Sequence, residues 1–271
     1  MQTLGEIRSI LAEHGLHPKK ALGQNFLHDQ NQLRRLLEAS EVGPGDVVLE
    51  VGPGTGTLTE ALLDRGCIVV ACELDRDLAA ILENRIGDRI TLVRDDCLED
   101  QRTLSGAILD ALSGRTFSLV SNLPYGAATP LMSLLSSRSD CRSQHVTIQR
   151  EVADRLLARP GGKSFGSLTA FVGALASVRR IGTLPPGCFW PPPKVESAMI
   201  SIVPHEKPLI DDPEAFGDFL HRLFSRRRKQ LGTIMGREAL LPSGVVRTVR
   251  PEQLSVAELV EIHRLNARLD G

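Results

Sequence analysis

The stretch Asp46-Val-Val-Leu-Glu-Val-Gly-Pro-Gly-Thr-Gly56 decides the fold expected of this chain. Its β-branched and apolar residues are typical of a short strand that is buried on both faces. The three glycines that follow allow a tight turn and let the backbone approach a ligand closely. A helix is expected next, over residues 57–65. A strand, a glycine-rich turn and a helix in this order predict the first unit of a parallel sheet.

Further apolar runs and helical segments extend this alternation on both sides. We predict strands at residues 67–72, 90–93, 117–120 and 145–148. We predict helices at residues 2–14, 29–40, 76–84 and 129–137, with Asp29 as the N-cap of the second. Continuous apolar strands that alternate with helices predict an α/β fold whose sheet is covered on both faces.

The pattern changes after about residue 182, where prolines become frequent and a solvent-flanked strand is expected over residues 195–203. The helices predicted beyond it are 213–224, 227–236 and 252–269. We therefore place a domain boundary near residue 204. The predicted domains are 1–204, which includes an N-terminal helical extension 1–28, and a small helical domain 205–271.

The composition is that of an ordinary globular chain. Of 271 residues, 42% are hydrophobic and 24% are charged, and the formal net charge of −1 does not by itself indicate a polyanionic partner. No run approaches the roughly 18 apolar residues of a membrane span, and the charged N-terminus argues against a signal peptide. Five cysteines without a CxxC pair suit neither zinc nor a disulfide framework. We expect a cytoplasmic protein with reduced thiols, no membrane association and no metal.

Polar residues follow the predicted strands where ligands bind in an open parallel sheet. Gly52, Gly54 and Gly56 have the spacing GxGxG, which is neither the dinucleotide fingerprint nor the P-loop. Glu73, at the end of the second strand, can accept both hydroxyls of a ribose, although an acid that begins a helix is the alternative. Asp96 can accept an adenine amine; neighbouring Asp95 is the competing candidate, and a helix cap is the other explanation. Together these residues predict a nucleoside site.

Asn122-Leu-Pro-Tyr125 is the most specific local motif. The Asn122 side-chain oxygen and the Leu123 carbonyl can each accept one hydrogen of an aromatic exocyclic amine, which favours a nucleophilic, tetrahedral nitrogen. Pro124 stiffens the turn, and Tyr125 can stack on a flipped base. The alternative is a surface turn after a buried strand, because Asn and Pro are common turn residues.

Two later segments are candidates for contacts with a base and with RNA. In Phe189-Trp-Pro-Pro-Pro-Lys194, we expect Phe189 to form the second wall of a base pocket and Trp190 to pack between domains. Packing is the alternative for Phe189, and a place in the base wall is the alternative for Trp190. The cluster Arg226, Arg227, Arg228 and Lys229, together with Lys194, is the candidate RNA-binding set. The cluster is expected to begin a helix, where cations oppose the macrodipole, and this favours a functional role for them. A solvated helix face is the alternative.

Seven motifs in one order resemble the small-subunit (16S) rRNA adenine N6-dimethyltransferases. They are Leu22–Leu27, Glu50–Gly56, Glu73–Asp75, Asn122–Tyr125, Gln149–Ala153, Phe189–Val195 and Phe224–Lys229. The resemblance implies a Rossmann-like class I methyltransferase domain with a small C-terminal helical domain. It implies S-adenosyl-L-methionine as cofactor, with contacts from Asn25, Leu27, Gly52, Gly54, Glu73, Asp96 and Asn122.

The same resemblance implies a substrate and leaves alternatives. The expected partner is 16S rRNA within the 30S subunit or its precursor, where two adjacent adenosines of the 3′-terminal hairpin receive four methyl groups from a monomeric enzyme. The chain departs from the family at Gly126, where Asn is frequent, and at Phe165-Gly166, where an aromatic hydroxyl is usual. The alternatives are a large-subunit rRNA adenine methyltransferase of the antibiotic-resistance type, a ribosome assembly factor without turnover, and, more distantly, an NAD-dependent oxidoreductase.

Overall fold

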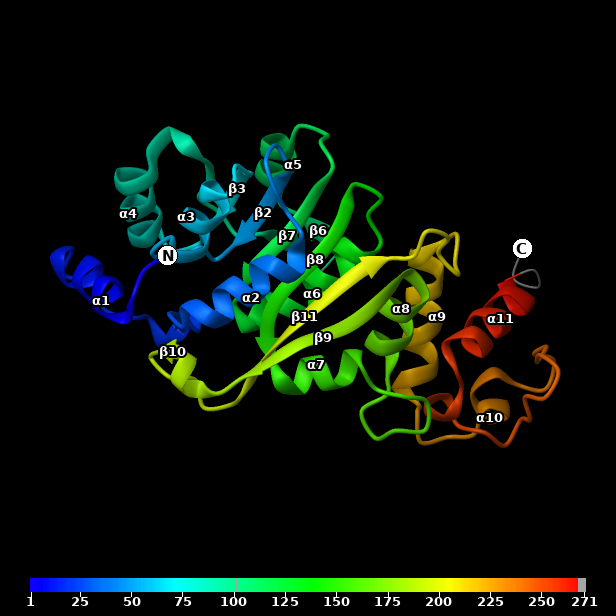
Figure 1. Cartoon of the computed structure of the whole chain (residues 1–271). Helices are drawn as coiled ribbons and strands as arrows, with labels where there is room; N and C mark the ends of the chain where they lie inside the picture. The colour runs from blue at the N-terminus through cyan, green and yellow to red at the C-terminus, as the bar shows by residue number, and fades with distance from the viewer. Residues whose placement is uncertain (101, 268–271) are drawn as a thin grey trace. The chain divides into compact units, whose positions relative to one another are not determined.

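The computed structural model describes residues 1–100 and 102–267, which fold into two compact units (Figure 1). The first unit comprises Met1–Ala153 and Arg179–Val203. The second comprises Asp154–Val178 and the chain from Pro204 onward. The chain enters the second unit at residue 154, returns to the first at residue 179 and enters the second again at residue 204, near the predicted boundary. Residues 154–178, however, which the sequence placed with the sheet, pack with the second unit.

A seven-stranded sheet in the order β4-β3-β2-β7-β8-β11-β9 organises the first unit (Figure 1). Its strands are β2 (Val47–Val51), β3 (Ile68–Cys72), β4 (Thr91–Val93), β7 (Phe117–Asn122), β8 (Cys141–Gln149), β9 (Ala176–Leu184) and β11 (Ser197–Pro204). Strands β4, β3, β2, β7 and β8 run parallel, and β11 is antiparallel to β8. The chain winds outward from β2 to β4 and returns to β7, so the topological switch point, where ligands bind in such sheets, lies between β2 and β7.

The core of the first unit explains why β2 reads as a continuous apolar run. All five β2 residues are buried, and successive side chains point to opposite faces, so both faces of the sheet are covered. Helices α2 (Gln30–Ser40), α3 (Thr57–Asp64), α5 (Gly106–Leu112) and α6 (Tyr125–Ser136) contact strands of the sheet, and α4 (Arg76–Ile86) packs with α1 (Leu4–Glu13). Two small strand pairs, β1 (Phe26–Leu27) with β10 (Phe189–Trp190) and β5 (Leu98–Asp100) with β6 (Thr103–Leu104), complete the unit.

Short polar side chains fix where the helices begin. The Asp29 carboxylate accepts hydrogen bonds from the N–H groups of Asn31 and Gln32, which confirms the predicted N-cap of α2. Asp75 caps α4 by accepting from the N–H of Asp77. Thr3 caps α1 in a capping box with Glu6.

The second unit is helical and has its own core. Its helices are α8 (Ser167–Leu175), α9 (Pro213–Ser225), α10 (Leu231–Met235) and α11 (Val256–Ala267), and α7 (Arg150–Leu156) ends within it. The apolar face of α9, which includes Phe216 and Phe219, is buried against residues of α8 and α11. Because the partner of α8 lies beyond residue 204, the local pattern around residues 154–178 does not reveal to which unit α8 belongs.

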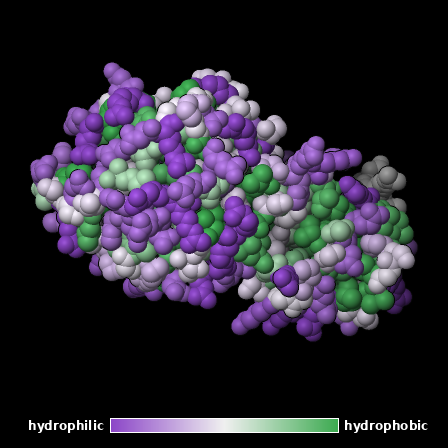
Figure 2. All heavy atoms as spheres, viewed as in Figure 1, coloured by the Kyte–Doolittle hydropathy of each residue, from purple (hydrophilic) through white to green (hydrophobic). Residues whose placement is uncertain are grey.

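Within residues 1–100 and 102–267, none of the helices has both the length and the apolar character needed to cross a bilayer. The described residues also contain no cluster of three metal-ligating side chains. Hydrophilic side chains cover much of the face of the first unit seen in Figure 2, whereas the second unit exposes apolar groups such as Leu240 and Val246.

Candidate active site

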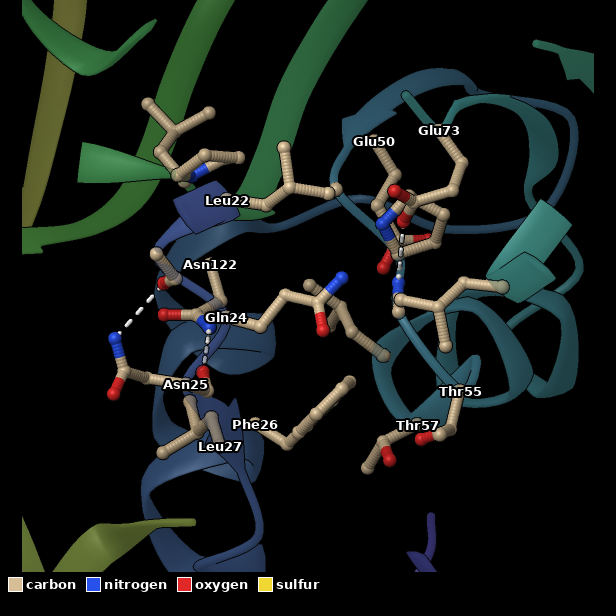
Figure 3. Close-up of a pocket in the computed structure, with 18 of the residues that line it drawn as sticks. Leu22, Gln24, Asn25, Phe26, Leu27, Glu50, Thr55, Thr57, Glu73 and Asn122 are labelled. Carbon is tan, nitrogen blue, oxygen red and sulfur yellow. Dashed lines mark hydrogen bonds between the residues drawn. The ribbon is translucent and has the colours of Figure 1, made fainter. Parts of the chain in front are cut away.

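Two adjoining cavities lie at the carboxyl ends of β2, β3 and β7, at the switch point of the sheet. Figure 3 shows residues that line the first. The first has a volume of about 120 Å³ and the second about 430 Å³. The second volume falls in the range of about 300–1,000 Å³ that is usual for small-molecule sites. Both cavities are lined by Leu22, Gly23, Gly52, Glu73, Leu74, Pro124 and Tyr125.

The glycine-rich loop after β2 lines the first cavity, and at Gly52 and Gly54 it is packed too tightly to admit a side chain. Gly52 and Gly54 have φ of +72° and +63°, in the left-handed region. A Cβ on Gly52 would lie 2.9 Å from Cγ of Pro124, and a Cβ on Gly54 would lie 2.9 Å from Cε1 of Phe26. The loop therefore contacts both the Asn122–Tyr125 turn and the Asn25–Leu27 segment, which brings three of the quoted motifs together.

Two buried carboxyl groups stand beside this loop. Glu73 is 6% exposed, lines both cavities and accepts hydrogen bonds from the N–H groups of Gly54 (3.1 Å) and Asp75 (2.9 Å). Burial raises the pKa of Glu73, although these two N–H groups act in the opposite direction. Burial also raises the pKa of Glu50, to about 8, while Thr59 donates a hydrogen bond to it. Since Asp75 provides the N-cap of α4, Glu73 is not needed as a cap.

The Asn122–Tyr125 turn is held from three sides. The Asn122 amide donates from Nδ2 to the carbonyl oxygen of Asn25 (3.1 Å), so its Oδ1 is the atom left to accept (Figure 3). The N–H of Leu123 donates to the Thr147 carbonyl (3.1 Å). The Tyr125 hydroxyl shares a hydrogen bond with Ser197 Oγ (2.8 Å), and burial raises the pKa of this phenol. The turn is therefore a fixed element that borders the same cavities as the glycine-rich loop.

The residues expected to contact an adenosine-containing cofactor are divided between the cavities. Asn25, Leu27, Gly54 and Asn122 line the first cavity. Asp96 lines the second, and so does the competing candidate Asp95. Gly52 and Glu73 line both and connect the two sets.

Several residues that complete the site were not expected from the sequence. Gln24 lines the first cavity and donates from Nε2 to Oδ2 of Asp75 (2.7 Å), while Lys19 Nζ forms ion pairs with Asp75 and Asp77, both at 2.7 Å. These bonds connect the segment 19–24, which precedes β1, to the start of α4. Partners more than 50 positions apart leave no local pattern, although Gln24 lies within the Leu22–Leu27 motif and Lys19 shortly precedes it.

Phe189 does not occupy the place expected of it. The side chain is 3% exposed and belongs to the core of the first unit, and it is not part of the lining of either cavity. Its backbone pairs with Leu27 in the β1–β10 ladder. Trp190 packs against Phe26 with ring centroids 6.3 Å apart and carries the Arg8 guanidinium over its face, a packing role within the first unit.

The basic cluster of the second unit follows a helix rather than beginning one. Arg226 is the C-cap of α9, and α10 begins only at Leu231, so the helix predicted over 227–236 is wrong at its start. Cations are favourable near a helix C-terminus, so the argument from an opposed macrodipole is wrong. All four cluster residues are exposed, and Arg227 donates to the carbonyl oxygen of Lys163 (3.1 Å). Lys194, also exposed, belongs to the first unit.

Solved structures share this architecture. A dimethyladenosine transferase from Plasmodium falciparum superposes with a TM-score of 0.73 at 21% identity, covering 90% of this chain and 98% of that one. The 23S rRNA methyltransferase ErmE superposes with a TM-score of 0.62 at 25% identity, covering 89% of this chain and all of that one. The expected Rossmann-like class I methyltransferase fold is thereby confirmed.

Sequence comparison identifies the family. The chain is 37% identical to ribosomal RNA small subunit methyltransferase A of Moorella thermoacetica, with 97% of each chain covered. It is 39% identical to the protein of that name from Rhodococcus opacus, with 95% of this chain and 92% of the relative covered. The family described as ribosomal RNA adenine dimethylase matches residues 15–267. The chain therefore belongs to the ribosomal RNA adenine dimethylase family.

Proposed function

We propose that this protein uses S-adenosyl-L-methionine to dimethylate the N6 amines of two adjacent adenosines in the 3′-terminal hairpin of 16S rRNA. The substrate would be the 30S subunit or its precursor in the cytoplasm, and the enzyme would act as a monomer. The observation that carries the proposal is the Asn122 amide, which is oriented by the Asn25 carbonyl beside the glycine-rich loop. An acceptor fixed next to a cofactor cavity is what transfer to an amine requires.

The lining of the two cavities fits the proposed cofactor. At Gly52 and Gly54 a Cβ would fill space against Pro124 and Phe26, so the backbone itself forms the wall. The buried Glu73 carboxylate has lone pairs beyond the two hydrogen bonds it accepts, and these can hold ribose hydroxyls. Asp96 would accept the adenine amine of the cofactor in the second cavity. Asn25, Leu27 and Asn122 would complete the cofactor contacts.

The chain's own residues would position the target amine. When bound, the cofactor supplies an electrophilic methyl group on a sulfonium. Asn122 Oδ1 and the Leu123 carbonyl would each accept one hydrogen of the target amine and so direct its lone pair away from the ring. Tyr125, held at its hydroxyl by Ser197, would stack on the extruded base. The amine can lose its proton after the new bond has formed, so positioning rather than a strong base carries the proposed reaction.

The relatives favour small-subunit RNA over the alternatives. The curated relatives named small subunit methyltransferase A are 35–39% identical over nearly the whole chain, whereas the 23S enzyme ErmE is 25% identical. For the RNA backbone we propose the exposed cluster Arg226–Lys229 together with Lys194. Phe189 is left out of the proposed base pocket because it is buried in the core.

Mapping of methylated nucleotides tests the proposal directly. Small subunits that lack the modification are incubated with the protein and the cofactor, and the rRNA is digested and analysed by mass spectrometry. We expect N6,N6-dimethyladenosine at two adjacent positions of the 3′-terminal hairpin. Methylation confined to 23S rRNA would instead support the large-subunit type. Normal binding to the subunit without any incorporation would support an assembly factor.

A further inference from the structure

The N-terminal segment ahead of the matched family region is tied into the wall of the cofactor cavity. Gln2 is only 3% exposed, and its amide makes four hydrogen bonds. Nε2 donates to the Thr55 carbonyl and to Oε1 of Glu60, both at 2.9 Å. Oε1 accepts from the hydroxyls of Thr55 (2.7 Å) and Thr57 (3.0 Å). Thr55 and Thr57 line the first cavity (Figure 3). Gln2 therefore holds the glycine-rich loop through these two residues.

Helix α1 supports the same loop through a second contact. Ile7, Ile10 and Leu11 on its buried face share an apolar cluster with Phe26. Phe26 in turn lies against Gly54, where a Cβ would be 2.9 Å from its ring. Gln2 thus hydrogen-bonds to the loop at Thr55 and Thr57, and α1 packs against the loop through Phe26.

We propose that Gln2 is a positioning residue for the cofactor, which it serves by holding the glycine-rich loop in its binding conformation. This inference rests on the cofactor placement proposed above. A loop with three glycines in the left-handed region loses much conformational freedom when it is ordered. Hydrogen bonds from Gln2 order the loop in the free protein, so binding does not have to supply that free energy.

A loss of this support should appear in cofactor binding and not in the chemical step. Gln2 lines neither cavity and lies behind the threonines, so it does not contact the reacting atoms. A residue that affects ground state and transition state equally changes KM and leaves kcat unchanged. This split separates a positioning role from a general loss of folded protein, which would lower kcat in proportion to the folded fraction.

The test compares Gln2→Met, which keeps the length of the side chain and removes all four hydrogen bonds, with a neighbouring control. Thr3→Ala weakens the capping box of α1 without touching the loop. We expect Gln2→Met to weaken S-adenosylmethionine binding in calorimetry by about tenfold and to raise KM by the same factor, with kcat within about twofold. Thr3→Ala should bind the cofactor within about twofold of the wild type. Gln2→Glu keeps the oxygen that accepts from both threonines but sets a second oxygen against the Thr55 carbonyl and Glu60 Oε1, so it should also lose affinity.

The outcomes are distinguishable. Equal affinity in folded Gln2→Met and wild-type protein overturns the inference, and so does an equal loss in Gln2→Met and Thr3→Ala. If Gln2→Met does not fold, Gln2→Glu is compared with Thr3→Ala under the same criterion. Absence of cofactor binding by the wild-type protein would count against the proposed function and not against Gln2 alone.

Discussion

Replacing Gly54 by alanine should destabilise the protein by about 2–5 kcal/mol, the sum of two separable costs. The first cost is backbone strain, because φ is +63° and an L-residue in that region loses about 1–2 kcal/mol. The second is overpacking. The new Cβ would lie 2.9 Å from Cε1 of Phe26, which is about 0.6 Å less than the lower end of the optimum of about 3.5–4.0 Å between carbons. Overpacking of this kind costs about 1–3 kcal/mol.

Gly15 offers a matched control for the first cost. Its φ is +65°, and a Cβ added there would meet nothing within 4 Å. Gly15→Ala should therefore destabilise by about 1–2 kcal/mol from backbone strain alone. The difference between the two variants in urea unfolding, followed by circular dichroism, reports the overpacking against Phe26.

A second substitution locates the clash. Phe26→Leu removes the ring atom that the new Cβ would meet, so the double variant Gly54→Ala/Phe26→Leu should be more stable than the sum of the single effects predicts. We expect a favourable coupling of about 1–3 kcal/mol. If Gly54→Ala costs no more than Gly15→Ala, or if the two substitutions add without coupling, the tight contact between the loop and Phe26 is refuted.

Three further substitutions test other parts of the site. Glu73→Gln should weaken S-adenosylmethionine binding by about 1–3 kcal/mol through loss of a charged acceptor, measured by calorimetry; unchanged affinity would remove the ribose assignment. Burial raises the pKa of Asp75, but hydrogen bonds from Lys19 and Gln24 outweigh it and the net pKa is lowered. The resulting stabilisation is present above about pH 4 and lost as the pH falls through the lowered pKa. Asp75→Asn should therefore be less stable than wild type at pH 7 in thermal unfolding, with the gap narrowing in acid; a gap independent of pH would contradict this. Arg228→Ala should weaken binding to the small subunit and reduce the slope of log affinity against log salt by about 1; an unchanged slope would exclude a phosphate contact there.

The sequence predicted those parts of the molecule that depend on neighbouring residues. The unit β2–glycine loop–α3 follows from a buried apolar run and three glycines, and the Asp29 cap follows from one short side chain. Strand ends gather in a parallel sheet by topology, so Glu73, Asn122 and the loop could be predicted to share a cavity without knowledge of any distance.

The parts that were missed depend on contacts across long sequence separations. The assignment of α8 to the second unit depends on α9, more than 40 residues later. The start of α10 was predicted four residues too early because arginine and lysine are good helix formers and do not mark an end. Likewise, no residue near Gln2 indicates that its partner is Thr55, 53 positions later. The sequence also did not distinguish burial of Phe189 in the core from exposure in a base pocket.

The central claim is that Asn122 holds the target amine, and single-turnover methyl transfer to unmodified small subunits by Asn122→Ala tests it most directly. Gly126→Ala, four residues later at the start of α6, is the control, because an added Cβ there would meet nothing within 4 Å. We expect Asn122→Ala to slow transfer by roughly 10²–10³-fold with folding and subunit affinity intact, and Gly126→Ala to stay within about threefold of wild type. A transfer rate for Asn122→Ala close to that of Gly126→Ala would contradict the account.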